Sequence, residues 1–164
     1  MSGWRLADTA WIMSGTRLGS ILLTAAGDRL AGVCIGAPDQ VGGALRIERT
    51  GVLGAAEVQL AEYLAGERTQ FDIPLAPRGS KFQHRVWGAL RNVPYGETTT
   101  YRELGETIGW PRAARAVGRA NASNPWPIIL PCHRVVGASG DLTGYRAGLS
   151  VKRWLLAHER ALAA

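Results

Sequence analysis

A thirteen-residue segment, residues 125–137, constrains the fold of this chain more than any other stretch. Its sequence, PWPIILPCHRVVG, is an apolar run stiffened by three prolines, each of which fixes its own φ. The run ends in Cys132, and His133 and Arg134 follow at once. The thiolate is the reactive form of cysteine, and a neighbouring base or cation makes it more available. The segment therefore points to a reactive cysteine.

A buried structural thiol is the alternative, because free cysteine is among the most buried residue types. Adjacent residues of an extended segment point to opposite faces, so an extended backbone would let His133 reach Cys132 more easily through a water. A base that activates a nucleophile also needs a third group to orient it. Glu159 is the leading candidate for that group, although a carboxylate beside an apolar helix face is often simply solvated.

Charge is distributed unevenly along the 164 residues. Residues 1–78 contain seven Arg and eight acidic residues, a net charge of −1, whereas residues 79–164 contain twelve Lys or Arg and five acidic residues, a net charge of +7. Seventeen of the nineteen basic residues are Arg, which suits contacts with phosphates and bases better than Lys does. A basic half that also holds the cysteine indicates an anionic macromolecular substrate. A GC-rich genome that favours Arg and Ala codons would give the same composition.

Two cysteines, Cys34 and Cys132, are too few for a disulfide framework, and nothing in the sequence suggests a metal cluster. We expect both to be free thiols in a reducing compartment. The sequence shows neither a secretory leader nor an apolar segment of membrane-spanning length. These features predict a cytoplasmic protein.

Alternating apolar residues in the first half predict a small antiparallel sheet. Its strands are expected at 9–14, 19–25 and 30–35. Turns are expected at 15–19 and 27–29, and a loop at 37–43. Cys34 falls in the third strand between Val33 and Ile35, so we expect it in the core.

One helix is expected over residues 55–64, with Gly66 as its stop. Its apolar side is predicted to carry Val58, Leu60, Ala61 and Leu64. Residues 71–75 read as an extended segment that its proline confines to an edge. Residues 76–80 are expected to link this half to the next.

The second half predicts three helices before the cysteine, at 82–91, 101–108 and 113–121. Thr100 and Glu103 have the spacing of a capping box at the start of the second helix. The second and third helices, joined by a turn at 109–111, form a helix-turn-helix candidate. A last helix is expected after Ser150 as its cap, with a buried stripe of Val151, Trp154, Leu155 and His158.

The helix at 113–121 is built mainly of small residues, with Arg115 and Arg119 on one face. Small side chains let a helix lie close against either another helix or a nucleic-acid groove. Few polar side chains are available for reading base edges, so an Arg that contacts phosphate or acts as a wedge fits the second possibility better. The glycine-rich segment 137–148 lacks a phosphate-loop pattern and reads instead as a pocket wall with Tyr145 as a stacking face.

From about residue 57 to residue 159, these motifs resemble the O6-alkylguanine-DNA alkyltransferases, also called methylated-DNA–protein-cysteine methyltransferases. The residues that carry the resemblance are, in chain order, Phe82-Gln83, Val86-Trp87, Gly96-Glu97-Thr98 with Tyr101, Ala113-Ala114-Arg115-Ala116-Val117-Gly118, Asn124-Pro125 with Pro127, Leu130-Pro131-Cys132-His133-Arg134-Val135-Val136, Gly144-Tyr145 and Leu155-Leu156-Ala157-His158-Glu159. Before residue 57 only the size and the strand pattern agree.

The resemblance implies a role for each matching residue. Cys132 would accept the alkyl group, His133 would act as a base through water, and Glu159 would orient His133. Asn124 would hold the turn of the cysteine segment, and Tyr101 would press on a phosphate and hydrogen-bond the flipped base. Arg115 would fill the vacated stack, and further DNA contacts would come from Thr100, Ala113, Ala114, Ala116, Gly118 and Arg119. The guanine pocket would be lined by Trp126, Pro127, Val135, Tyr145, Arg146 and Lys152.

The same resemblance implies an α+β fold of two domains. Residues 1–76 would form a ribonuclease-H-like lobe with a small antiparallel sheet and a helix, and residues 80–164 a mostly helical, winged-helix-like lobe that binds DNA. The partner would be double-stranded DNA carrying alkylated guanine (and, as a further substrate, O4-alkylthymine), bound through the minor groove by a monomer. DNA binding would place the protein at the nucleoid, with no cofactor and no membrane.

Three departures from the family pattern modify these expectations. Ala147 stands where many relatives have a second glycine, which predicts a stiffer pocket wall. The first half lacks the Cys and His cluster that binds zinc in some relatives, so no metal is expected. No phosphotriester-repair or regulatory domain precedes the unit, so no transcriptional role is expected. Two other functions stay open at this point, a non-catalytic lesion-binding module and a Cys-His hydrolase.

Overall fold

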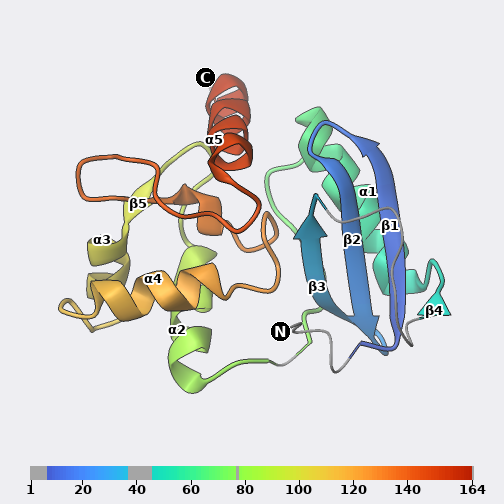
Figure 1. Cartoon of the computed structure of the whole chain (residues 1–164), viewed down its shortest axis with the longest axis horizontal. Coiled ribbons are helices and arrows are strands. Elements are labelled where there is room, and N and C mark those ends of the chain that lie inside the picture. Colours follow the sequence, from blue (N-terminus) through green and yellow to red (C-terminus); the bar gives the residue numbers. More distant parts are fainter. Residues whose placement is uncertain (1–6, 37–45, 77, 164) are drawn as a thin grey trace. The chain divides into compact units, whose positions relative to one another are not determined.

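The computed structural model describes residues 7–36, 46–76 and 78–163. The chain divides into two compact units, Met1–Pro77 and Arg78–Ala164 (Figure 1). Strands and helices occur in both units, so the predicted α+β class is confirmed. The loop predicted at 37–43 lies outside the described residues. No helix in the described ranges is long and apolar enough to cross a membrane.

The N-terminal unit contains a four-stranded sheet. Its strands are β1 (Thr9–Thr16), β2 (Gly19–Ala26), β3 (Arg29–Ile35) and β4 (Arg46–Ile47). Their order in the sheet is β3-β2-β1-β4. The first three strands are antiparallel neighbours, as predicted, whereas the short β4, which the sequence did not suggest, pairs in parallel with β1. Leu75 forms an isolated bridge with Leu30, which places the predicted extended segment against β3.

Helix α1 (Gly51–Ala65) packs on the sheet of this unit (Figure 1). It ends, as predicted, at Gly66, which has a φ of 84°. It begins four residues earlier than expected, and its buried stripe is Leu53, Gly54, Ala56, Leu60 and Tyr63. The predicted stripe was therefore wrong in part, because spacings of three and four from Leu53 turn Val58 towards solvent, where it is 47% exposed. Ala61 is also exposed and Leu64 is half-buried.

The prediction that Cys34 lies in the core was wrong, because the residue is only half-buried. Successive side chains of a strand point to opposite faces, and the buried Val33 and Ile35 share the face that Cys34 does not. Cys34 instead packs against a small cluster formed by Ala10 and Leu22.

The C-terminal unit consists of four helices, one 3-10 turn and a two-stranded parallel sheet. The elements are α2 (Lys81–Leu90), β5 (Thr99–Thr100), α3 (Tyr101–Thr107), α4 (Ala114–Ala122), η1 (Cys132–Arg134), β6 (Val135–Val136) and α5 (Leu149–Ala163). Helices α2, α3 and α4 pack against one another, and α5 contacts η1. Strands β5 and β6 pair Thr99 with Val135 and Thr100 with Val136, which joins the start of α3 to the cysteine segment.

The helix starts of this unit follow local signals. Thr100 accepts a hydrogen bond from the Glu103 amide and the Glu103 carboxylate accepts one from the Thr100 amide, the predicted capping box. Ser80 and Gln83 form a second capping box before α2 that the sequence analysis did not identify. Gly105 lets α3 pass close to the following turn, because a Cβ there would lie 2.9 Å from the carbonyl oxygen of Trp110.

The phase of α5 differs from the prediction. The helix begins at Leu149, so Ser150 lies inside it and not at its cap. The buried positions are Lys152, Leu155, Leu156 and Glu159. The other residues predicted in the buried stripe, Val151, Trp154 and His158, are half-buried. The buried face of α5 is rotated relative to the predicted one, because Lys152 and Glu159 have hydrogen-bond partners inside the unit.

Candidate active site

The segment before the cysteine is held by one side chain. Asn124 donates from Nδ2 to the carbonyl of Leu130 at 2.9 Å and accepts from the amide of Trp126 at 3.0 Å. These bonds close the turn that contains Ile128, whose φ of 74° lies in the left-handed region that β-branched residues rarely adopt. The turn is therefore a strained conformation that Asn124 helps to maintain.

Cys132 begins a single 3-10 turn, so the segment is not extended at the cysteine. The amide of Cys132 donates to the carbonyl of Leu130 at 2.8 Å. Its own carbonyl accepts from Nδ2 of Asn121, on α4, at 3.3 Å. The side chain is 5% exposed. The backbone of Cys132 is therefore tied to α4 through Asn121, a link that sequence reasoning missed.

His133 is completely buried and forms its side-chain contact with α5. Its Nε2 lies 2.7 Å from Oε1 of Glu159, which is also completely buried. The predicted base and its predicted orienting carboxylate are thus in contact although they are 26 residues apart. The solvated alternative for Glu159 is wrong, because the carboxylate points into the unit.

Arg134 holds the same carboxylate from the other side. Its Nε donates to Oε2 of Glu159 at 2.8 Å and its NH2 donates to Oε1 at 2.9 Å. Its NH1 donates to the carbonyl of Val93 at 2.6 Å, and its guanidinium lies 5.5 Å from the ring centroid of Tyr95. The sequence suggested that Arg134 would raise the thiolate fraction of Cys132, but the structure directs its charge to Glu159.

The hydrogen bonds on Glu159 determine its charge. Burial by itself would raise its pKa, but the hydrogen bonds from His133 and Arg134 hold the pKa well below its ordinary value. The amide of Gly96 also donates to Oε2 at 3.3 Å. A Cβ at Gly96 would lie 2.7 Å from the Cβ of Ala163, so this close approach requires glycine. Glu159 is therefore ionised and acts as an acceptor only.

An ionised acceptor fixes the tautomer of His133. Because Glu159 can only accept, Nε2 of His133 carries the proton and Nδ1 has a free lone pair. Nδ1 is buried, and no described residue hydrogen-bonds to it. Burial lowers the pKa of His133, and the charges of Arg134 and Lys152 lower it further against the opposing effect of Glu159. The ring is therefore neutral at physiological pH and able to accept a proton.

The thiol of Cys132, the residue before His133, is also protonated at rest. Burial raises the pKa of its thiol above the ordinary value, and Asn124, Lys152 and Tyr145 offset only part of that effect. Burial next to the thiol also raises the pKa of Tyr145 well above its ordinary value. The resting site therefore holds a neutral thiol and a neutral phenol.

The positive charge of Lys152 lowers the pKa of the Cys132 thiol and so offsets part of the effect of burial. It is completely buried, and its Nζ donates to the carbonyls of Val135 at 2.6 Å and Thr143 at 2.8 Å. Burial lowers its pKa, and the negative charge of Cys132, when the thiol is ionised, opposes that change. Lys152 therefore connects α5, β6 and the glycine-rich loop around the sulfur of Cys132.

Tyr101 lies at the first position of α3. Its hydroxyl accepts a hydrogen bond from the hydroxyl of Thr143, 3.1 Å away on the glycine-rich loop. Its ring lies close to α4, because a Cβ at Gly118 would be 3.7 Å from it. Of the other residues predicted to contact DNA, Arg115 and Arg119 are exposed, and Thr100, Ala113, Ala114, Ala116 and Gly118 are half-buried.

The residues predicted for the base pocket divide into three groups. Val135 and Tyr145 lie with Lys152 around Cys132, as the hydrogen bonds and pKa effects show. Arg146 is exposed. Trp126 is buried with its ring edge-on to Trp87, 5.5 Å away between centroids, and Pro127 is buried beside it in the chain. The described residues contain no group of three or more His, Cys, Asp and Glu side chains that could bind a metal ion.

Comparison with known proteins places this geometry in context. Residues 81–161 match the family model described as the DNA-binding domain of 6-O-methylguanine DNA methyltransferase. A methylated-DNA–protein-cysteine methyltransferase of Mycolicibacterium paratuberculosis is 63% identical over 107 residues, which are 65% of this chain and 64% of that protein. The constitutive methylated-DNA–protein-cysteine methyltransferase of Bacillus subtilis is 40% identical over 88% of this chain and 92% of its own length.

A solved structure agrees with the fold of nearly the whole chain. The crystal structure of Mycobacterium tuberculosis OGT in complex with DNA superposes with a TM-score of 0.85 at 43% identity. The superposition covers 94% of each chain. The match therefore includes the N-terminal unit, which the sequence motifs alone do not reach.

Proposed function

The chain belongs to the family of methylated-DNA–protein-cysteine methyltransferases, and from this premise we propose that it repairs alkylated DNA by direct reversal. The alkyl group of O6-alkylguanine in duplex DNA is transferred to the sulfur of Cys132; O4-alkylthymine is a second substrate. The observation that carries the proposal is the buried series of Cys132, His133 and Glu159, in which the histidine tautomer is set for proton removal. DNA as the partner is supported by the DNA complex of the M. tuberculosis protein and by the charge of residues 79–164.

The first step removes the proton from the thiol. A water between Sγ of Cys132 and Nδ1 of His133 passes the proton to the imidazole, and Glu159 stabilises the imidazolium through its bond to Nε2. Arg134 keeps Glu159 ionised, so the proton on Nε2 stays with His133. Lys152 stabilises the thiolate. These groups supply a nucleophile that the thiol alone does not provide at neutral pH.

The second step transfers the alkyl group. The thiolate attacks the alkyl carbon, a C–S bond forms, and the C–O6 bond breaks with its electron pair moving to the purine. Proton donation to the purine, for which Tyr101 is the candidate, stabilises the departing guanine. The product is a thioether, which neither water nor His133 can readily cleave. Each protein molecule therefore acts once.

Access to the thiol requires that the base leaves the helix. O6 of guanine lies inside the duplex and Cys132 is 5% exposed, so the nucleotide must be extruded at a cost of a few kcal/mol. The exposed Arg115 of α4 would enter the stack and offset part of that cost. The small residues of α4 let the helix lie close to DNA in the minor groove, and Tyr101 presses on the neighbouring phosphate.

The test is the mass of the intact protein after mixing with a duplex that contains one O6-methylguanine. We expect the mass to increase by one methyl group, at a yield of one methyl per protein, and no increase for Cys132→Ala. Tight lesion binding without a mass change would indicate a lesion-binding module instead. Repeated turnover of an activated ester that depends on Cys132 would indicate a hydrolase.

A further inference from the structure

We infer that the turn between α3 and α4 makes a second contact with DNA, in which the ring of Trp110 packs against the sugar–phosphate backbone away from the lesion. The inference rests on the proposed function, because it requires α4 to lie on a duplex. It assigns a role to Trp110, an aromatic residue that neither the candidate active site nor the predicted DNA-contacting residues include.

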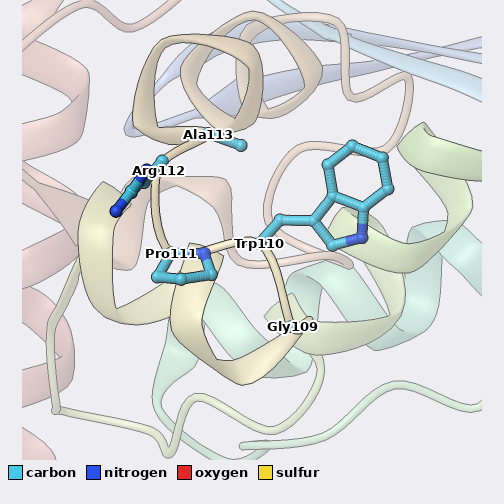
Figure 2. Close-up of a pocket in the computed structure, with 5 residues that line it drawn as sticks. All are labelled: Gly109, Trp110, Pro111, Arg112 and Ala113. Atoms are coloured by element: carbon cyan, nitrogen blue, oxygen red, sulfur yellow. The ribbon is translucent and has the colours of Figure 1, made fainter.

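The turn forms a shallow hollow on the surface of the C-terminal unit. It is lined by Gly109, Trp110, Pro111, Arg112 and Ala113 and has a volume of about 400 Å³. Figure 2 shows the Trp110 ring and the Arg112 side chain on opposite sides of Pro111. Trp110 is 51% exposed, which is unusual for a side chain with so much apolar surface.

The exposed ring is held in one place. The amide of Trp110 donates to the carbonyl of Gly105 at 2.7 Å, and its carbonyl accepts from the amide of Ala113 at 3.0 Å. The ring of Phe82, on α2, meets the ring of Trp110 nearly edge-on with centroids 5.4 Å apart. A side chain that is ordered before binding loses little conformational entropy on binding. Trp110 therefore has the properties of a preorganised contact.

The positive charge around the hollow favours an anionic partner. Arg112 is exposed and forms no ion pair with any of the described residues. Arg115 and Arg119 follow on the exposed face of α4, so the hollow is continuous with the surface that we propose to contact DNA. An anionic polymer with an apolar sugar face between its phosphates matches an aromatic ring flanked by arginines.

The orientation of the two side chains defines the contact further. Because the Trp110 ring and the Arg112 side chain lie on opposite sides of Pro111, the proposed contact has them meet the backbone at two separate positions (Figure 2). The indole N–H of Trp110 can only donate, and no described residue accepts from it. A phosphate oxygen is a suitable acceptor, while the ring face covers a deoxyribose. Neither contact reads a base, so the binding is independent of sequence.

The test is equilibrium binding to a short undamaged duplex over a series of salt concentrations. We expect Trp110→Ala to weaken binding roughly fivefold, the lower end of what an aromatic stacking contact contributes. The slope of log K against log salt should stay the same, because no charge is removed. Arg112→Ala should instead reduce that slope by about 0.9, the value for one lost phosphate contact. Trp110→Phe should retain most of the affinity, and Val58→Ala, at an exposed apolar site of the N-terminal unit, should retain all of it.

Wild-type affinity in Trp110→Ala would overturn the inference. So would an equal loss of alkyl transfer from duplex DNA and from free O6-alkylguanine base, because the ring would then only support α2 and α3. A loss that occurs on long duplexes but not on short ones would assign the hollow to a second copy of the chain. If the wild-type protein takes no methyl group from any substrate, the proposed function fails, and the binding comparison still decides whether the turn contacts DNA.

Discussion

The two units of the chain differ in whether they bury charged side chains. In the described part of the N-terminal unit, the buried polar residues are the uncharged Thr9 and Thr24, and the ion pairs are at least partly exposed. In the C-terminal unit, His133, Arg134, Lys152 and Glu159 are all buried. Both units nevertheless have apolar cores of ordinary side chains, such as Leu23 and Leu60 in the first and Leu104 and Leu155 in the second.

This difference indicates that the C-terminal unit is the one arranged for the proposed reaction. Burying ionised groups is expensive unless each is paired and hydrogen-bonded, and apolar replacements often stabilise a protein as well or better. A unit that needed only stability would resemble the N-terminal one. The buried charges of the C-terminal unit instead set the protonation states of Cys132, His133 and Glu159, which an apolar core cannot do.

The largest expected effect comes from removing the buried carboxylate. Glu159→Gln leaves Arg134 buried without a counter-charge, so we expect the C-terminal unit to lose about 3–5 kcal/mol of unfolding free energy. Alkyl transfer should also become much slower, because the tautomer of His133 is no longer fixed. Hydrogen exchange in urea, followed peptide by peptide, measures the two units separately.

The matched control for that change is Glu57→Gln in the N-terminal unit. Glu57 lies 2.5 Å from Nε of Arg49, but the two side chains are 24% and 48% exposed. Its loss should cost about 0.2–1 kcal/mol, the range for exposed pairs. Equal losses for the two variants would contradict the contrast between the units.

A smaller effect is expected from removing the buried amine. Lys152→Met keeps much of the side-chain volume but removes the cation that lowers the pKa of Cys132. We expect a higher thiol pKa and roughly tenfold slower transfer, the effect of one lost opposite charge near a titrating group. The ultraviolet absorbance of the thiolate, measured in a Cys34→Ser background, reports the pKa. Lys81→Met, at the only other lysine, exposed at the start of α2, should change neither quantity.

The smallest effect is expected from pH. His133 has a lowered pKa when folded, so below the ordinary value of 6.5 the unfolded chain binds a proton that the folded unit does not. The stability of the C-terminal unit should therefore fall as pH decreases below 6.5, by at most about 1.4 kcal/mol per pH unit. Glu159, whose folded pKa is also lowered, adds a further loss only below its ordinary value of 4.5.

The N-terminal unit provides the comparison for that pH dependence. Residues 1–77 contain no histidine, so their stability should remain level until carboxylates titrate below about pH 4.5. His133→Gln should remove the slope of the C-terminal unit between pH 6.5 and 5. Hydrogen exchange at a series of pH values measures both, and a slope that persists in His133→Gln would assign it to another group.

Local patterns in the sequence were sufficient for much of the fold. Alternation predicted the three antiparallel strands, Gly66 predicted the end of α1, and Thr100 with Glu103 predicted the start of α3. Each of these signals depends on residues a few positions apart. The motif around Cys132 was equally local, and it predicted a reactive cysteine with a base beside it.

The tertiary structure alone decided which face of each helix is buried and which charged groups meet. Val58 and Leu60 read as one apolar side, yet only Leu60 packs on the sheet. Nothing near Glu159 in the sequence shows that it is buried, because its partners His133 and Arg134 lie more than twenty residues away. A charged side chain can be buried only where other groups pair with it, and these groups can be far away in the sequence. Helix caps and strand alternation depend instead on residues that are neighbours in the sequence. The sequence by itself therefore predicted the thiol that we propose to react and the start of α3. The packing of α5 against the cysteine turn decided which buried charged groups meet beside it.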